Sequence, residues 1–127
     1  MTRYLTRQFA MGALRRGKGI EQFLGGAEVN GEAAVRWVEV APRSGEYRIS
    51  LHTVRDPDDD QFLDLPNFVS LDPVDEDYVG QGRELGRGAD PEEAVRLAEE
   101  LTAARPDRWV NTAVAGEDYA DYVRRSR

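Results

Sequence analysis

The chain has 127 residues, of which 40% are hydrophobic and 32% charged, with a formal net charge of −7 and no cysteine. This size and composition are typical of one globular domain with a single core. Without cysteine, disulfides, thiolate nucleophiles and cysteine metal sites are excluded, and we expect a cytoplasmic protein. No apolar run approaches the about 20 residues of a membrane helix, so we expect no membrane span.

Charge is sorted along the chain rather than mixed. The first 20 residues contain basic side chains and no acid. Between residues 56 and 82 the pattern reverses, because nine acids occur there without a single Lys or Arg: Asp56, Asp58, Asp59, Asp60, Asp64, Asp72, Asp75, Glu76 and Asp77. Sorted charge determines which partners a surface attracts.

Helical periodicity marks the N-terminal part of the chain. Leu5, Phe9 and Ala13 recur every fourth residue and predict a helix over residues 3–15 that buries these side chains. Three apolar residues repeat the helical spacing between 20 and 24 before a pair of glycines, which predicts a short second helix.

A β-hairpin follows. Residues 34–41 and 46–55 are rich in β-branched and aromatic side chains, and Pro-Arg-Ser-Gly at 42–45 has turn chemistry. Alternation along the second strand predicts that His52 lies with Arg48 and Ser50 on the face toward water, while the opposite face meets the core through Tyr47, Ile49, Leu51 and Thr53.

The middle of the chain is less regular. Residues 61–65 predict a third strand, which Pro66 separates from an irregular or edge segment at 67–71. Residues 72–82 are rich in acid and glycine and predict a loop, and residues 83–88 predict an edge strand.

The C-terminal third contains the strongest helix signal. Asp90 and Pro91 supply an N-cap and a first helical residue, and a capping-box acid follows at Glu93. The helix from Pro91 to Ala104 is predicted to pack through Val95, Leu97, Ala98 and Leu101. A strand over 108–115 and a last helix over 116–125, burying Tyr119, Tyr122 and Val123, complete the order.

These elements predict a single α+β domain over residues 1–127. We expect a mainly antiparallel sheet of about four to five strands with helices packed on one face.

Two motif-like stretches fail at decisive positions. Residues 12–19 match a phosphate-binding loop until Gly19 replaces the Ser or Thr that would hold magnesium, and helical periodicity precedes them. Residues 56–67 begin like a calcium loop, but Gln61 replaces the turn glycine and Asn67 the bidentate Glu. We therefore expect no cofactor and no metal.

The sequence also gives little support for a catalytic site or for nucleic-acid binding. His52 is the single histidine, and we expect it at the surface. Asp64, flanked by two leucines, is the candidate for a buried acid. Trp37 and Trp109 are expected in the core, and a sequence pI near 4.8 disfavours nucleic-acid binding.

Four short pieces resemble small acidic proteins encoded by actinobacteria: Ile20-Glu-Gln-Phe-Leu-Gly25, Arg36-Trp-Val-Glu-Val, Arg108-Trp-Val-Asn111 and Tyr119-Ala-Asp-Tyr-Val123. This resemblance would span most of the chain and implies a bacterial protein, but no activity and no site.

The sequence hypothesis is a small acidic interaction or regulatory protein, of the immunity or inhibitor kind, that engages a basic protein partner. No catalytic constellation is visible, which favours a non-enzyme. The alternative is a small enzyme or ligand-binding domain with carboxylates near His52, and self-association stays open. The predicted partner-binding residues are Asp56, Asp58, Asp59, Asp60, Asp75, Glu76 and Asp77.

Overall fold

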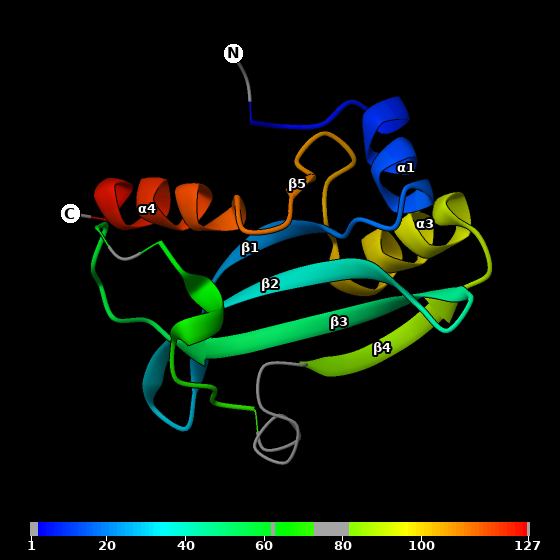
Figure 1. Ribbon diagram of the computed structural model, residues 1–127. Coiled ribbons are helices and arrows are strands. Elements are labelled where there is room, and N and C mark those ends of the chain that lie inside the picture. Colours follow the sequence, from blue (N-terminus) through cyan, green and yellow to red (C-terminus); the bar gives the residue numbers. More distant parts are fainter. Residues whose placement is uncertain (1–2, 62, 73–81, 127) are drawn as a thin grey trace.

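The computed structural model describes residues 3–61, 63–72 and 82–126 (Figure 1). One antiparallel sheet has the strand order β4-β3-β2-β1-β5. The α+β fold with a mainly antiparallel sheet is confirmed. The elements are α1 (Arg7–Arg15), β1 (Ile20–Val29), β2 (Glu32–Arg43), β3 (Glu46–Arg55), the 3-10 turn η1 (Leu65–Asn67), β4 (Arg83–Gly88), α3 (Pro91–Thr102), β5 (Val110–Asn111) and α4 (Ala115–Arg125).

The first helix forms within the predicted range 3–15 but begins only at Arg7, and of its predicted apolar stripe it buries Ala13 and not Phe9. Thr6 caps α1 by accepting a hydrogen bond from the backbone N–H of Phe9. The prediction that Phe9 is buried is wrong, because its side chain is 64% exposed. The buried residues are Ala10, Met11, Ala13 and Leu14, one position further round the helix.

The predicted second helix at 20–24 is wrong, because these residues begin strand β1. Short apolar runs fit a helix or a strand equally well, and pairing decides between them. Ile20 pairs with Val40 of β2 on one side and with Asn111 of β5 on the other. Gly25, at a φ of 102°, lies at the register shift in β1.

The β2–β3 hairpin confirms the strongest strand prediction. Its turn residues Ser44 and Gly45 both have positive φ, as a tight two-residue hairpin requires. The edge strand β4 then pairs with β3 as predicted.

Helix α3 begins at the predicted cap, where the Asp90 carboxylate accepts a hydrogen bond from the N–H of Glu93. Ala94, Val95 and Ala98 are fully buried, whereas Leu101 is 52% exposed. The prediction that Leu101 packs on the sheet is therefore wrong, and the buried stripe of α3 ends at Ala98, one turn before the helix ends at Thr102.

The two predicted strands around Pro66 and Trp109 are largely absent. Leu65–Asn67 form the η1 turn instead of continuing a strand, because Pro66 cannot donate a ladder hydrogen bond. After Trp109 only Val110 and Asn111 pair with the sheet, and α4 follows as predicted. Most of the predicted 72–82 loop lies outside the described residues.

Helices cover both faces of the sheet, not one face as the sequence predicted. On face A, α1 and α3 pack over Ile20, Val38, Val40 and Ile49. On face B, α4 and the turn η1 pack over Val35, Trp37 and Val54 (Figure 1). Alternate residues of β2 and β3 thus enter different cores, and the second face includes residues expected to meet water.

Candidate functional site

The acidic segment is the name used here for residues 56–61 and 63–72, which begin against α4 on face B. Tyr119 of α4 is fully buried, and its hydroxyl donates to Asp56 Oδ1 at 2.6 Å. The Tyr119 hydroxyl oxygen in turn accepts a hydrogen bond from the N–H of Asp59 at 3.3 Å. Burial, followed by the Asp56 carboxylate, raises the pKa of Tyr119. This contact attaches the start of the segment to the core.

Two acids of the segment are matched by arginines from elsewhere. Asp60 Oδ2 accepts from Arg124 at 3.1 Å. Asp72 is buried and accepts two hydrogen bonds from Arg83, each 2.9 Å long. Part of the charge that is continuous in sequence is therefore neutralised within the fold.

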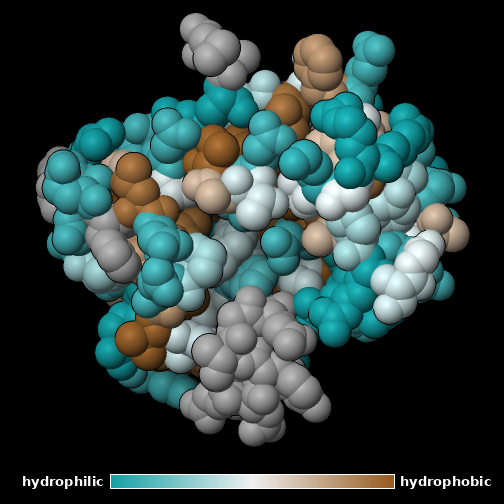
Figure 2. All heavy atoms as spheres, in the orientation of Figure 1, coloured by the Kyte–Doolittle hydropathy of each residue, from teal (hydrophilic) through white to brown (hydrophobic). Residues whose placement is uncertain are grey.

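The rest of the segment combines acid with apolar surface. Asp58, Asp59 and Asp64 are exposed. Leu63 and Val69 are also exposed, at 42% and 55%. Figure 2 shows brown, apolar atoms gathered on the side where α4 and this segment lie, with hydrophilic atoms around them. The predicted partner residues Asp75, Glu76 and Asp77 lie outside the described residues.

A cavity of about 310 Å³ opens beside the segment, and we call it the acidic pocket. Its wall depends on Gly116, because a Cβ there would lie 1.8 Å from the carbonyl oxygen of Leu63. The glycine lets the segment approach the first turn of α4 closely. The pocket is lined by Glu21, Leu63, Asp64, Leu65, Pro66, Ala113 and Gly116.

Glu21 supplies the buried charge of this pocket. It is 5% exposed, and its Oε2 accepts from the N–H of Ala115 at 3.1 Å. Val114 gives α4 no side-chain cap, so Glu21 serves the helix N-terminus from strand β1. Burial raises the pKa of the Glu21 carboxyl, backbone hydrogen bonds oppose this shift, and nearby Glu39 adds to it.

His52 is buried, with 6% exposure, so its predicted surface location is wrong. Its ring stacks on Trp37, with centroids 4.5 Å apart, because the two residues are partners in the β2–β3 ladder. A Cβ at Gly82, the residue just before β4, would lie 2.8 Å from the ring, so the backbone there covers the ring closely. Ser50, also expected in water, is buried beside it.

The carboxylate facing His52 belongs to Glu39, not to Asp64. Glu39 Oε1 lies 3.6 Å from His52 Nε2, and that nitrogen is buried without a hydrogen-bond partner among the residues that the structure describes. Glu39 is also the ladder partner of Glu21. Glu21, Glu39 and His52 therefore form a row across β1, β2 and β3 that starts at the acidic pocket.

Sequence reasoning missed Glu21 and Glu39. A usable signal exists for Glu21, since an acid inside the apolar run Ile20–Leu24 is either paired with a backbone group or placed in a site. Within the described ranges no group of three or more His, Cys, Asp or Glu side chains is arranged to hold a metal ion. No helix in the same ranges is long and apolar enough to cross a membrane.

Comparisons with protein-family models, with curated proteins and with solved structures found no match.

Proposed function

We propose that this protein binds a basic protein partner through the acidic segment, in the manner of an inhibitor or immunity-type antagonist. The observation that carries the proposal is the acidic pocket, where two carboxylates, those of Glu21 and Asp64, line a cavity beside the exposed Leu63. An Arg or Lys side chain of a partner fits such a cavity by charge and by shape.

The surroundings support a protein partner over a small ligand. Protein interfaces place apolar anchors at the centre and charged groups at the rim. Here Leu63 and Val69 provide exposed apolar surface, and Asp58 and Asp59 provide exposed charge nearby in the chain. A basic partner would contact the apolar side chains and the acids in the same interface.

Association kinetics test the proposal. Asp58, Asp59 and Asp64 are changed to Lys together; Asp60 is kept because it pairs with Arg124. A captured basic partner should associate at least about tenfold more slowly at low salt, since rim charges act mainly through steering. The difference should shrink as salt shortens the screening length to about 8 Å.

A matched control carries the same charge change on other surfaces. Glu28, Glu46 and Glu100 are exposed acids outside the acidic segment, and their triple change to Lys should slow association far less. Leu63→Ser should instead accelerate dissociation, because a central apolar anchor is lost. Equal association rates for the two triple variants would refute the proposal.

A second candidate function is a small enzyme or ligand-binding domain built on His52. It is favoured by the buried His52 Nε2 beside Glu39, a nitrogen that no hydrogen-bonding group of the described ranges satisfies. In this reading Glu39, rather than Asp64, is the carboxylate that acts with the ring. NMR of His52 Nε2 tests this candidate. Its signal should shift when a small-molecule extract is added to the wild type, and should not shift in a variant that lacks the Glu39 carboxylate.

A further inference from the structure

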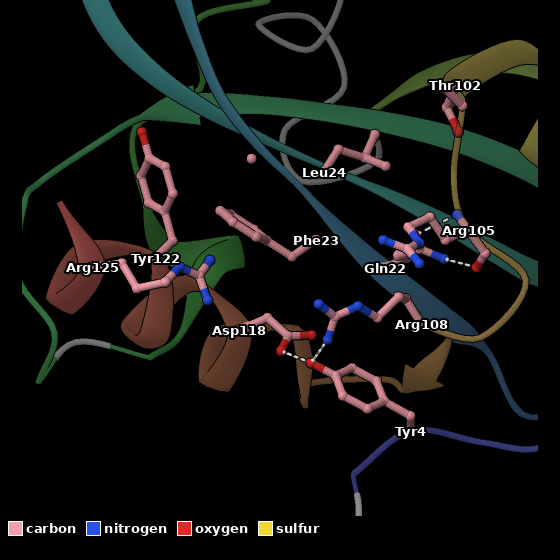
Figure 3. Close-up of a pocket in the computed structure, with 12 residues that line it drawn as sticks. Tyr4, Gln22, Phe23, Leu24, Thr102, Arg105, Arg108, Asp118, Tyr122 and Arg125 are labelled. Carbon is pink, nitrogen blue, oxygen red and sulfur yellow. Dashed lines mark hydrogen bonds between the residues drawn. The ribbon is translucent and has the colours of Figure 1, made fainter.

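A second cavity, of about 330 Å³, lies at the other side of α4 (Figure 3). We name it the arginine pocket. β5 pairs with β1 only at Ile20 and Glu21, so the edge of β1 from Gln22 onward is left to face this cavity. The lining includes Arg105, Arg108 and Arg125.

Among the residues that line the arginine pocket, these three arginines face one acid, Asp118. That carboxylate already accepts from Arg3 at 2.8 Å and from the hydroxyl of Tyr4. Arg105 forms an ion pair with Asp107, in which Arg105 Nε lies 3.5 Å from Asp107 Oδ1. Asp118 therefore does not neutralise the remaining arginines of the pocket.

Two guanidinium groups remain for a ligand. Arg108 donates to the Tyr4 hydroxyl and lies 4.7 Å from the centre of that ring, and it forms no ion pair with any described residue. Arg125 likewise has no acid partner within the described part of the chain and is exposed. In Figure 3 the two side chains approach the cavity from opposite sides, with Phe23 between them.

The walls of the pocket are held in place. Gln22 is 3% exposed, and its amide accepts from the N–H of Arg105 at 2.7 Å and donates to the Arg105 carbonyl at 2.9 Å. Phe23 packs on Tyr122 with ring centroids 5.6 Å apart. Fixed walls reduce the entropy lost when a ligand binds.

We propose that the arginine pocket binds a phosphate monoester that carries a flat ring. Two uncompensated guanidinium groups match the charge of about −1.5 to −2 on a phosphate monoester, and its three oxygens suit their forked donors. A carboxylate, with a single charge, would leave one guanidinium unmatched. Phe23 and Tyr122 offer the aromatic surface against which a ring packs. This inference does not depend on the proposed partner binding.

Calorimetric titration of the full chain with phenyl phosphate tests the site, with benzoate as the carboxylate comparison. Phenyl phosphate should bind at least about tenfold more tightly than benzoate. It carries about one more negative charge than benzoate, and that charge would lie between two guanidinium groups. Titrations with adenosine monophosphate and with acetyl-phosphotyrosine amide distinguish a nucleotide from a phosphorylated protein side chain. Absence of phenyl phosphate binding, or equal binding of benzoate, would overturn the proposal.

The neighbouring arginines of α4 supply a matched pair of variants. Arg125→Gln should weaken phenyl phosphate binding at least about tenfold, whereas Arg124→Gln should leave it unchanged, because Arg124 pairs with Asp60 on the other side of the helix. Arg108→Lys keeps the charge but loses the fork, and should also weaken binding. Equal affinities for the two Gln variants would place the ligand elsewhere and refute the site.

Discussion

The acidic segment and the arginine pocket lie on two sides of helix α4, and their charges are arranged in opposite ways. The acids of the segment are continuous in sequence, yet Asp60 and Asp72 are paired with arginines within the fold. The arginines of the pocket are separated in sequence, yet Arg105, Arg108 and Arg125 line one cavity. Clustering along a chain and clustering in space are therefore different properties, and the second determines what a surface attracts.

Helix α4 separates the two regions through its periodicity. Gly116 and Arg124 contact the acidic segment, while Asp118, Tyr122 and Arg125 line the arginine pocket. Asp118, Tyr122 and Arg125 recur at the spacing of three and four residues that places side chains on one side of a helix. Single changes on α4 should consequently affect one region and leave the other intact.

The largest expected effect is that of Gly116→Ala. The added Cβ would lie 1.8 Å from the backbone oxygen of Leu63, so the acidic segment must move away. We expect destabilisation of about 3 kcal/mol, the upper end of ordinary overpacking costs, measured by urea unfolding. Binding of the partner should be lost, whereas phenyl phosphate binding should persist.

Gly12→Ala is the control for this change. Its Cβ would meet only the flexible end of Arg16, at 3.1 Å, in the middle of α1. Alanine favours a helix over glycine by about 1 kcal/mol, so this variant should be stabilised. If Gly116→Ala behaved the same way, the close contact between segment and helix would be refuted.

Tyr119→Phe should have the next largest effect. It removes the hydroxyl that donates to Asp56 at 2.6 Å and leaves this carboxylate without its buried partner. Hydrogen bonds to charged groups contribute about 1.5 to 3 kcal/mol, and Asp56 is half-buried, so we expect about 1.5 kcal/mol.

Tyr122→Phe makes the same chemical change on the pocket side of α4. The Tyr122 hydroxyl has no hydrogen-bond partner in the described part of the chain, so little stability should be lost. Equal losses for the two variants, measured by urea unfolding, would show that Tyr119 does not anchor the acidic segment.

A smaller effect should appear in the pH dependence of Glu21→Gln. Burial raises the pKa of Glu21 above its ordinary 4.5, so the folded chain holds this proton more tightly than the unfolded chain. Wild-type stability should therefore fall relative to the Gln variant as pH rises through and above 4.5, until the folded carboxyl is ionised.

Urea unfolding of both proteins at pH 4 and pH 7 measures this difference, in which the titration of groups that do not interact with Glu21 cancels. A stability difference that is constant with pH, or that changes in favour of the wild type as pH rises, would show that Glu21 is not a buried acid.

The sequence predicted the fold class, the hairpin and α3, because their signals are local. Turn residues at 42–45 and the cap at Asp90 act within a few residues of the chain. It failed at β1, where a short apolar run carries no decisive period and the strands on both sides determine the outcome.

The candidate sites were less predictable than the fold. His52 alternates correctly along β3, but alternation says only which face it shares, not that α4, η1 and Trp37 cover that face. The arginine pocket joins Tyr4 to residues more than 100 positions away, such as Arg108. No pattern in one sequence records such a contact, because tertiary packing creates it.

The smallest effect is expected from removing Arg124 or Arg125, and it separates the two regions most directly. Arg124 pairs with Asp60 at 3.1 Å but is itself 56% exposed, and exposed ion pairs contribute about 0.2 to 1 kcal/mol. Arg124→Ala should therefore cost a few tenths of a kcal/mol, and this cost should decrease at high salt. Arg125→Ala should cost less, because no described acid pairs with it.

A double-mutant cycle isolates the Arg124 contribution. Arg124 also lies 3.6 Å from Asp121. If the Asp60 ion pair is the main cause, Arg124→Ala should cost less in a chain that already carries Asp60→Asn, and the remainder should reflect the Asp121 contact. The cost of Arg125→Ala should be the same in both backgrounds. Thermal unfolding at low and high salt gives the four stabilities. A coupling energy of zero between Asp60 and Arg124 would mean that α4 does not neutralise the acidic segment, and the segment would then present more charge to a partner than the ion pair implies.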